Sequence, residues 1–186
     1  MRASLIMVAG IIEIQSISSQ RAREVIEQLA GVEWKPSSIA TKHDVSRIRE
    51  FVDSQQRDAL SAGFDRASDI CKALLEETTT GILHAIKAEY GLTLKKISAP
   101  QFTKYQQGHF IAPHRDTGQA YPNRIFSAVT YLSDDYQGGE IDFPTIGKSY
   151  LPKSGTTLVF PADMLHAVKP VKSGVKQIFL FFIDKE

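Results

Sequence analysis

A chain of 186 residues in which 42% are hydrophobic and 23% are charged has the composition of an ordinary folded globular protein, and it is long enough to bury a sizeable core. Its formal net charge of +1 provides no electrostatic basis for binding nucleic acid or a membrane, and neither partner is expected. The single cysteine, Cys71, excludes an internal disulfide, so a cytoplasmic location is expected and the thiol is predicted to be buried in a helix. The sequence gives no indication of an oligomeric state.

The first apolar stretch, residues 1–12, has only a superficial likeness to a signal peptide. Glu13 interrupts the apolar pattern, no cleavage site of small residues follows, and the stretch is too short to span a bilayer. We interpret it as one or two strands that lead into the domain. Residues 11–17 alternate apolar and polar side chains, which also predicts a strand.

Two amphipathic helices are predicted in the N-terminal half. The first covers residues 20–29, with Ser18–Ser19 as its capping residues. The second covers residues 68–90, where apolar residues recur at helical spacing, with Ser68 as its cap. Inside the second helix, the run 78–81 (Thr-Thr-Thr-Gly) has low helix propensity, so a kink or break is predicted there.

The segment between these helices is less regular. Residues 34–39 are predicted to be extended because Pro36 is unfavourable in a helix interior, and Trp34 is expected to anchor the core. The charged residues 42–62 are only partly periodic and are interpreted as a helix.

The C-terminal half consists of short runs of β-branched and aromatic residues that alternate with Gly, Pro, Asp and Asn turns, a pattern typical of strands. The predicted strands are residues 94–105, 109–114, 125–132, 139–143, 149–151, 156–160, 167–171 and 175–183. We therefore expect an α+β fold, a double-stranded β-helix (jelly roll) of about eight core strands with the N-terminal helices packed on its outer face. A single domain, residues 1–186, is predicted, with a strand and helix part at 1–93 and the jelly roll at 94–186.

A candidate metal site lies within this half. His114 and Asp116 are two residues apart, so on an extended strand their side chains would point to the same face. His166, which follows a later strand, would complete a set of two imidazoles and one carboxylate. Such a set leaves three adjacent coordination positions open and is typical of non-haem Fe(II) oxygenases.

The His-x-Asp pattern alone is weak, because five histidines and many acidic residues make one chance occurrence nearly expected, and a surface turn is the alternative. Lys176 strengthens the hypothesis. It opens an apolar strand, where a buried ammonium group needs a carboxylate partner, and a ligand carboxylate would supply one.

A series of short motifs also stands in register along residues 95–184, nearly half of the chain. These are Tyr105-x-x-Gly108, His114-x-Asp116, Arg124-x-x-Ser127-x-x-Thr130-Tyr131-Leu132-Ser133, Tyr136-x-Gly138-Gly139-Glu140, Pro152-x-x-Gly155, His166-x-Val168-x-Pro170-Val171 and Gly174-x-Lys176. Together they resemble the catalytic domain of the prolyl 4-hydroxylase-like 2-oxoglutarate/Fe(II) oxygenases, which include the bacterial PKHD-type hydroxylases. The residues before this region carry no motif of that family.

The resemblance implies roles for five residues. His114, Asp116 and His166 would be the Fe(II) ligands, and Lys176 would pair with the distal carboxylate of 2-oxoglutarate. Tyr105 matches the tyrosine that lies near this co-substrate in relatives. The resemblance further implies O2 as the second co-substrate and ascorbate as an optional reductant.

Two of these positions bear on the subgroup. Lys176 fits the prolyl-hydroxylase-like pattern, whereas PKHD-type relatives usually have arginine there, so the subgroup stays open. Asp116 stands where related halogenases have a small residue, which favours hydroxylation.

Other residues near the motifs have alternative interpretations. His109 is interpreted as a non-ligand, since its spacing from His114 places it on the opposite face of a strand. Arg124 either faces the site or pairs with Asp134 or Asp135. The loop at 117–123 either borders the access to the site or is simply a mobile surface loop.

The function these observations favour is Fe(II)- and 2-oxoglutarate-dependent hydroxylation of an unactivated C–H bond in a small molecule, amino acid or short peptide. A protein prolyl hydroxylase is the alternative substrate class. A non-catalytic sensor of oxygen, iron or a 2-oxo acid on the same fold is an alternative function, and a cupin-type metal enzyme is a third, although it would normally offer His-x-His.

Overall fold

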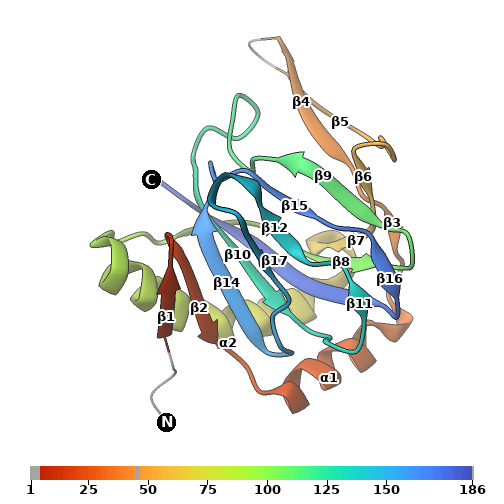
Figure 1. Cartoon of the computed structure of the whole chain (residues 1–186), viewed down its shortest axis with the longest axis horizontal. Coiled ribbons are helices and arrows are strands. Elements are labelled where there is room, and N and C mark those ends of the chain that lie inside the picture. Colours follow the sequence, from red (N-terminus) through yellow and green to blue (C-terminus); the bar gives the residue numbers. More distant parts are fainter. Residues whose placement is uncertain (1–4, 45–46, 186) are drawn as a thin grey trace.

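The computed structural model describes residues 5–44 and 47–185, and residues 1–4 of the apolar opening lie outside the described part. Two antiparallel sheets face each other, and two helices lie against one of them (Figure 1). The major sheet has eight strands in the spatial order β1 (Leu5–Val8), β2 (Ile11–Gln15), β14 (Thr156–Pro161), β10 (Arg124–Tyr131), β17 (Lys176–Asp184), β8 (Lys96–Tyr105), β7 (Leu60–Gly63) and β3 (Lys35–Pro36). Strands from both halves of the chain therefore share this sheet.

The minor sheet carries much of the motif region. Its five strands have the order β13 (Lys148–Tyr150), β12 (Ile141–Phe143), β15 (His166–Val168), β9 (Phe110–His114) and β6 (Arg57–Asp58). Two further antiparallel pairs are β11 (Gln137–Gly138) with β16 (Val171–Ser173), and β4 (Ile39–Asp44) with β5 (Arg47–Phe51). The β4–β5 hairpin projects from the sheets (Figure 1).

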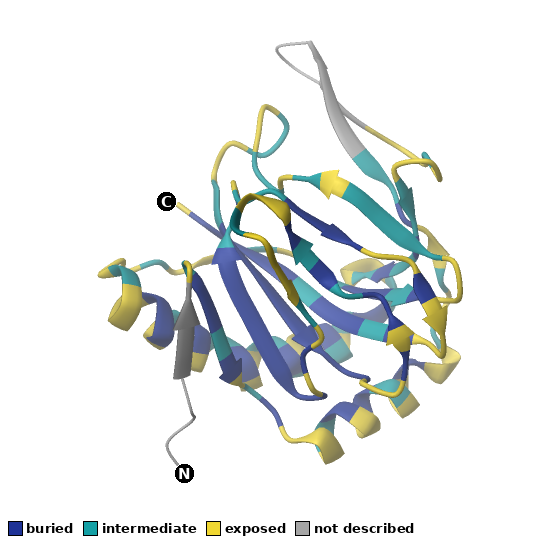
Figure 2. Cartoon of the chain, viewed as in Figure 1, coloured by how far each residue is buried: buried dark blue, intermediate teal, exposed yellow. Residues whose placement is uncertain are grey.

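The central strands of the major sheet, β14, β10 and β17, are buried on both faces, which explains why their sequences are nearly continuous apolar runs (Figure 2). Alternate residues of each strand point to opposite faces. In β17, for example, Phe179 and Phe181 join a cluster shared with both helices, whereas Ile178 joins a cluster shared with the minor sheet. The space between the two sheets holds the second cluster.

Helix α1 (Ser19–Gln28) begins where the sequence predicted, because the Ser18 hydroxyl accepts a hydrogen bond from the backbone N–H of Arg21 at 3.0 Å. A short 3-10 turn, η1 (Leu29–Gly31), follows it, and a second, η2 (Pro144–Ile146), connects β12 to β13. Cys71 is fully buried in α2 (Phe64–Tyr90), as predicted.

Two predictions about α2 were wrong. The helix begins at Phe64 after Gly63, and the Ser68 hydroxyl contacts the Asp69 carboxylate rather than capping the helix. The predicted kink at 78–81 is absent from the described helix, whose non-helical backbone lies at Ala67. Packing explains the regularity: Thr78 and Ile82 are buried, and Ile82 belongs to the apolar cluster shared with the major sheet. The Thr78 hydroxyl donates within the helix to the Leu74 carbonyl at 2.6 Å, so it is not left unsatisfied.

The helix expected at 42–62 was also wrong, since this segment contributes to β4, β5, β6 and β7. A hairpin that projects from the sheets needs no apolar face, and its charged sequence therefore lacks the alternation of apolar and polar residues by which half-buried strands are predicted.

Residues 34–39 include β3, and Trp34 is only partly buried, with the Lys104 ammonium 4.1 Å from its ring centroid. Within the described residues, no helix is both long enough and apolar enough to cross a membrane.

Candidate metal centre and adjoining cavities

The two histidines of the predicted site come from neighbouring strands of the minor sheet. Strands β9 and β15 are paired with His114 opposite His166, and the two ring centroids are 4.3 Å apart. Each Nδ1 lies within hydrogen-bond distance of a backbone carbonyl, Ala112 O at 2.9 Å for His114 and Met164 O at 3.0 Å for His166. A carbonyl can only accept, so Nδ1 carries the proton in both rings and Nε2 is free to bind a cation.

Asp116 completes the group, although not in the way its spacing suggested. Strand β9 ends at His114, so Asp116 lies in the following bend rather than on the same strand face. Its backbone N–H donates to the Ala162 carbonyl at 2.8 Å, which fixes the bend against the turn before β15. The Asp116 oxygens are then 3.5 Å from the Nε2 of His114 and 3.4 Å from the Nε2 of His166.

Neighbouring groups shift the pKa values of Asp116 and His166. Burial alone would raise the pKa of Asp116, but His166, His114 and the Ser127 hydroxyl, which donates at 2.5 Å, hold it well below its usual range. Burial lowers the pKa of His166, although Asp116 acts in the opposite direction. An ionised carboxylate and a neutral imidazole are the forms that bind metals.

This donor set fits a metal ion. The ligand atoms of His114, Asp116 and His166 all lie within 4.8 Å of one another, and they are two imidazole nitrogens and a carboxylate oxygen. Three protein ligands on one side of a cation leave positions free for exogenous molecules, which is the arrangement that non-haem Fe(II) uses. The three residues that the sequence predicted as metal ligands, His114, Asp116 and His166, therefore lie together in the fold.

An inner cavity of about 60 Å³ joins this trio to Lys176. Lys176 is 1% exposed, and among the described residues its ammonium group has one hydrogen-bond acceptor, the Gly139 carbonyl at 2.7 Å. Burial lowers the pKa of Lys176 to about 7, although Glu140 acts in the opposite direction. A carboxylate entering this cavity would satisfy the remaining N–H groups and restore the charge.

Two tyrosines line the same cavity. Tyr105, predicted near the site, is 1% exposed, and its ring centroid is 5.3 Å from the Lys176 ammonium. Tyr131 was not predicted as a site residue, yet its ring centroid is 5.1 Å from the same ammonium. The Tyr131 hydroxyl is buried without a hydrogen-bond partner among the described residues, so it is a second donor available to a ligand.

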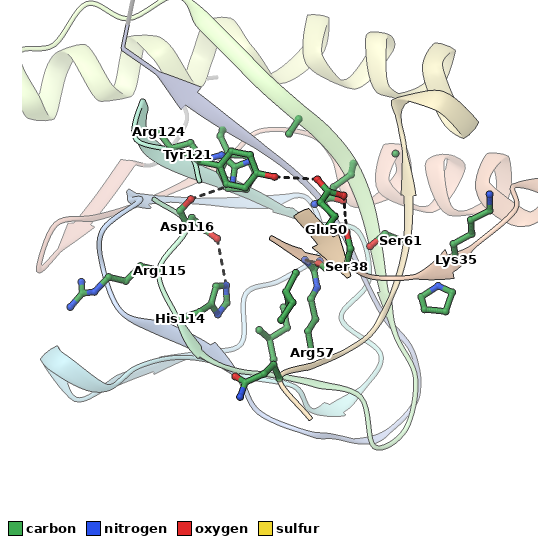
Figure 3. Close-up of a pocket in the computed structure, with 18 of the residues that line it drawn as sticks. Lys35, Ser38, Glu50, Arg57, Ser61, His114, Arg115, Asp116, Tyr121 and Arg124 are labelled. Atoms are coloured by element: carbon green, nitrogen blue, oxygen red, sulfur yellow. Dashed lines mark hydrogen bonds and ion pairs between the residues drawn. The ribbon is translucent and has the colours of Figure 1, made fainter. Parts of the chain in front are cut away.

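An outer groove of about 630 Å³ opens on the other side of the trio (Figure 3). His114 and Asp116 line this groove, whereas His166 lines only the inner cavity. The predicted loop at 117–123 borders the groove through Tyr121, whose hydroxyl donates to the Glu50 carboxylate of β5 at 3.1 Å. A metal held by the trio would therefore lie between the smaller inner cavity and the larger outer groove.

The structure decides between the alternatives for Arg124. Its guanidinium carbon lies 3.7 Å from the Tyr121 ring centroid and 3.5 Å from the Phe182 ring centroid, and Nη1 donates to the Asp116 carbonyl at 3.2 Å. Arg124 therefore supports the bend that carries a predicted ligand. Figure 3 shows the Arg115 side chain directed away from His114 and Asp116.

His109 lies outside the ligand group, as interpreted from its spacing, and its Nε2 is 3.8 Å from the Asp58 carboxylate. Ser127 and Arg57 were missed as site residues. Nothing in the Arg124-x-x-Ser127 spacing indicates that the serine hydroxyl contacts Asp116, eleven residues earlier in the chain. Arg57 lies in the segment that was wrongly interpreted as a helix. Contacts between distant segments leave no local pattern in the sequence.

Known proteins with similar sequences or structures agree with this geometry. The sequence model of the 2OG-Fe(II) oxygenase superfamily matches residues 100–184. A PKHD-type hydroxylase of Klebsiella pneumoniae is 26% identical over 179 residues, which cover 90% of this chain and 75% of that protein.

Solved structures show the same fold at low sequence identity. A Pseudomonas putida prolyl-4-hydroxylase superposes with a TM-score of 0.73 at 19% identity, covering 95% of this chain and 93% of that chain. The viral collagen prolyl hydroxylase of Paramecium bursaria Chlorella virus-1 superposes with a TM-score of 0.67 at 22% identity, covering 95% and 97% of the two chains. These superpositions confirm the predicted jelly-roll fold.

Proposed function

Since this chain belongs to the 2OG-Fe(II) oxygenase superfamily and is a 2-oxoglutarate-dependent dioxygenase, we propose that His114, Asp116 and His166 hold its Fe(II). The observation that carries the assignment is the position of the trio at the junction of two cavities. The inner cavity supplies a buried cation for a dicarboxylate co-substrate, and the outer groove supplies space for a second molecule.

The inner cavity would bind 2-oxoglutarate. The Lys176 ammonium would pair with the distal carboxylate of the co-substrate, and the unpartnered Tyr131 hydroxyl would donate a second hydrogen bond to it. The buried Tyr105 would pack beside the carbon chain. Because Lys176 and the three proposed ligands line the same cavity, a co-substrate whose distal carboxylate is held by Lys176 would turn its opposite end toward the metal ligands.

Fe(II), when bound, supplies the activation of O2 and the oxidative decarboxylation of 2-oxoglutarate to succinate and CO2, coupled to hydroxylation of a C–H bond. The protein's own contribution is positional. Ser127 and Arg124 hold Asp116 in place through its side chain and backbone, and the two Nδ1 hydrogen bonds fix the imidazole planes. Aromatic residues around His166, including Phe143 and Phe160, keep water away from the inner side.

The substrate we propose is a small molecule, an amino acid or a short peptide. The outer groove is bounded by polar and charged side chains and is of a size suited to a ligand of this class. A prolyl residue in a longer peptide is the second candidate, because the groove is open at the surface and solved structures of the same fold include prolyl hydroxylases.

An anaerobic titration tests the assignment. Fe(II) is added to the purified protein with and without 2-oxoglutarate while the visible absorption is recorded. A weak charge-transfer band that needs both additions is expected, because it reports the 2-oxo acid bound directly to the metal. Succinate release in air then separates an enzyme from a sensor. Iron binding without the band would favour a cupin-like or sensing role.

Two variants test the roles proposed for His166 and Lys176. His166→Ala should abolish Fe(II) binding, whereas His84→Ala, which removes an exposed histidine of α2, should leave it unchanged. Lys176→Ala should raise the 2-oxoglutarate concentration required while iron binding persists, with Lys172→Ala as the exposed-lysine control. Loss of iron affinity without a change in the 2-oxoglutarate requirement would show that Lys176 is misassigned.

A further inference from the structure

The outer groove has more positive than negative side chains, in contrast to the nearly neutral chain. Its basic residues are Lys35, Arg57, Arg66, Arg115 and Arg124, and its acidic residues apart from Asp116 are Glu50 and Asp65. Most of these charges already have a neighbour: Arg66 is 3.1 Å from the Asp65 carboxylate, and Arg124 is stacked between two rings. Arg57 differs from both.

Arg57 lies where the two cavities meet. It is the basic residue that lines both the inner cavity and the outer groove, and it shares each lining with His114 and Asp116. Its strand, β6, pairs with β9 so that Arg57 stands opposite Ile111, three residues before His114. The guanidinium is therefore placed beside the metal ligands and not at the outer rim.

One edge of the Arg57 guanidinium has no partner among the described residues. Nη1 donates to the Ser38 carbonyl at 3.3 Å, whereas Nε is buried without an acceptor. A buried N–H group without an acceptor is unfavourable, and this effect is larger for a charged donor. The Nε–H group is thus unsatisfied in the protein alone, and a ligand that brings acceptor oxygens to the junction of the two cavities would supply its missing partner.

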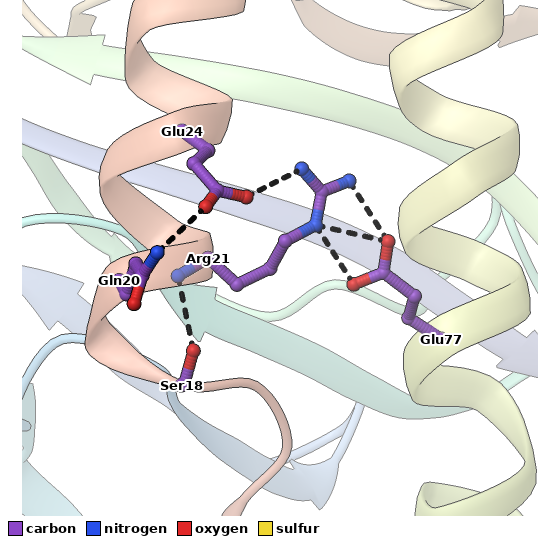
Figure 4. Close-up of polar contacts among 5 residues, drawn as sticks. All are labelled: Ser18, Gln20, Arg21, Glu24 and Glu77. Atoms are coloured by element: carbon purple, nitrogen blue, oxygen red, sulfur yellow. Dashed lines mark hydrogen bonds and ion pairs between the residues drawn. The ribbon is translucent and has the colours of Figure 1, made fainter.

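A carboxylate matches this edge. The same chain contains a reference geometry, in which Arg21 contacts Glu77 through Nε at 3.0 Å and Nη2 at 2.8 Å (Figure 4). In that pair two parallel N–H groups on one side of the guanidinium face two carboxylate oxygens, an arrangement specific to arginine. Arg57 presents the corresponding side, with its Nη1 held by Ser38 and its Nε free.

We propose that the Nε edge of Arg57 anchors a carboxylate of the substrate, so that the substrate class is carboxylic acids held in the outer groove beside the metal. The proposal rests on the proposed function for the identity of the metal site, but the binding itself depends only on Arg57 and the groove. Arg57 is a specificity-determining residue that orients the substrate toward His114 and Asp116.

Calorimetric titration with matched ligand pairs tests this proposal. The probes are N-acetylated amino acids and the corresponding C-terminal amides, in which a neutral carboxamide replaces the carboxylate. They are titrated into the purified protein and into protein loaded anaerobically with Fe(II) and saturating 2-oxoglutarate. Variants Arg57→Gln and Arg57→Lys are compared with Arg66→Gln, which removes an equal charge from the groove rim where Asp65 already neutralises it.

At least one acid should bind about tenfold or more tightly than its amide, as expected for a charge-assisted pair. Arg57→Gln should lose this preference, and Arg57→Lys should recover only part of it because a lysine lacks the paired edge. Arg66→Gln should stay within about twofold of the parent. Thermal unfolding checks that Arg57→Gln is folded. Only a small change in stability is expected, because the variant loses the long Nη1 hydrogen bond to Ser38 together with the unpartnered Nε–H group.

The proposal would be overturned by equal binding of acids and amides, by an unchanged preference in Arg57→Gln, by binding of phosphomonoesters in place of acids, or by no binding of any acid at about 10 mM. Acid binding that is displaced by 2-oxoglutarate and lost in Lys176→Ala would place the acid in the inner cavity instead and equally overturn it. Failure of the metal assignment would be visible separately, as a missing charge-transfer band with the acid preference intact.

Discussion

At the scale of single residues, the metal centre is shaped by hydrogen bonds that do not touch the metal. The two backbone carbonyls beside Nδ1 choose the tautomer of each histidine, and the Ser127 hydroxyl holds one oxygen of Asp116. Such supporting contacts orient ligands and tune their basicity. Their loss should weaken metal binding without unfolding the protein.

Ser127→Ala tests this at one position. Removing the hydroxyl that donates to Asp116 at 2.5 Å should reduce Fe(II) affinity by about 10- to 100-fold, measured by equilibrium titration under anaerobic conditions. Ser133→Ala is the matched control, since that buried serine contacts the Val175 carbonyl and not a metal ligand. Equal affinity losses in the two variants would mean that the effect is a general weakening of the fold.

Lys176 gives a prediction about pH. Burial lowers its pKa to about 7 in the folded protein from 10.5, so between these values the unfolded chain binds more protons. The free energy of unfolding should therefore increase with pH across this window, and the burial penalty is fully present below about pH 7.

Lys176→Met removes that group, so its stability should exceed that of the parent near pH 6.5 and the difference should shrink toward pH 9.5. Urea unfolding at several pH values without 2-oxoglutarate measures both curves, with the exposed Lys172→Met as control. Parallel curves would show that Lys176 keeps an ordinary pKa. The expected result would mean that this lysine is retained at the expense of stability because it binds a ligand.

The metal ligands could be predicted from sequence because they fall in short motifs, and the fold brings His114, Asp116 and His166 together as expected. Tyr131 and Arg57 could not be predicted as site residues from sequence. Each was identified by a buried polar atom without a hydrogen-bond partner, which only the three-dimensional structure shows. The sequence also misplaced Asp116 on the strand, because the backbone bond to Ala162 that creates the bend joins residues 46 positions apart in numbering.

At the scale of elements, the predicted C-terminal strands correspond to strands of the two sheets. The prediction was clearest for β10, β14 and β17, because burial on two faces requires an apolar and β-branched composition. The β4–β5 hairpin was not predicted because its charged sequence carries no regular alternation of apolar and polar residues. The regular backbone at 78–81 shows that packing against a sheet overrides the low helix propensity of threonine.

The β11–β16 pair offers a prediction at this scale. Gly138 has a φ of +70°, and an added Cβ would lie 2.4 Å from the Pro170 carbonyl oxygen. Gly138→Ala should therefore displace β16 from β11 and disturb the adjacent Gly139 carbonyl that accepts from Lys176.

Gly147→Ala is the control, because its φ is +61° but nothing lies within 4 Å of the added atom. Gly147→Ala should lower the free energy of unfolding by about 1 kcal/mol from backbone strain, and Gly138→Ala by about 1–3 kcal/mol more. Chemical denaturation measures the difference. If the two variants lose the same amount, the close contact at β16 is relieved without consequence and the pair does not constrain the site.

At the scale of the whole molecule, we propose that the chain is one domain even though the family motifs occupy only its C-terminal half. Strands β1, β2, β3 and β7 from the first 93 residues complete the major sheet. The cluster between helices and sheet joins residues such as Ile12 and Leu74 to Phe102 and Phe179. Neither half has a complete apolar layer without the other.

The fragment 94–186 should therefore not fold alone, although it contains all three proposed metal ligands. Without α1 and α2, the face of β8, β10 and β17 that carries Phe102, Phe179 and Phe181 would be exposed to water, which is incompatible with a stable antiparallel sheet of this size. Near-ultraviolet circular dichroism should lack the native aromatic signal in the fragment, and its denaturant unfolding should lack the single cooperative transition expected of the full chain. If the fragment instead showed the native spectrum, cooperative unfolding and Fe(II) binding, the jelly roll would be an independent domain. The N-terminal half would then contribute Arg57 and Glu50 to the lining of the outer groove without being needed for the fold.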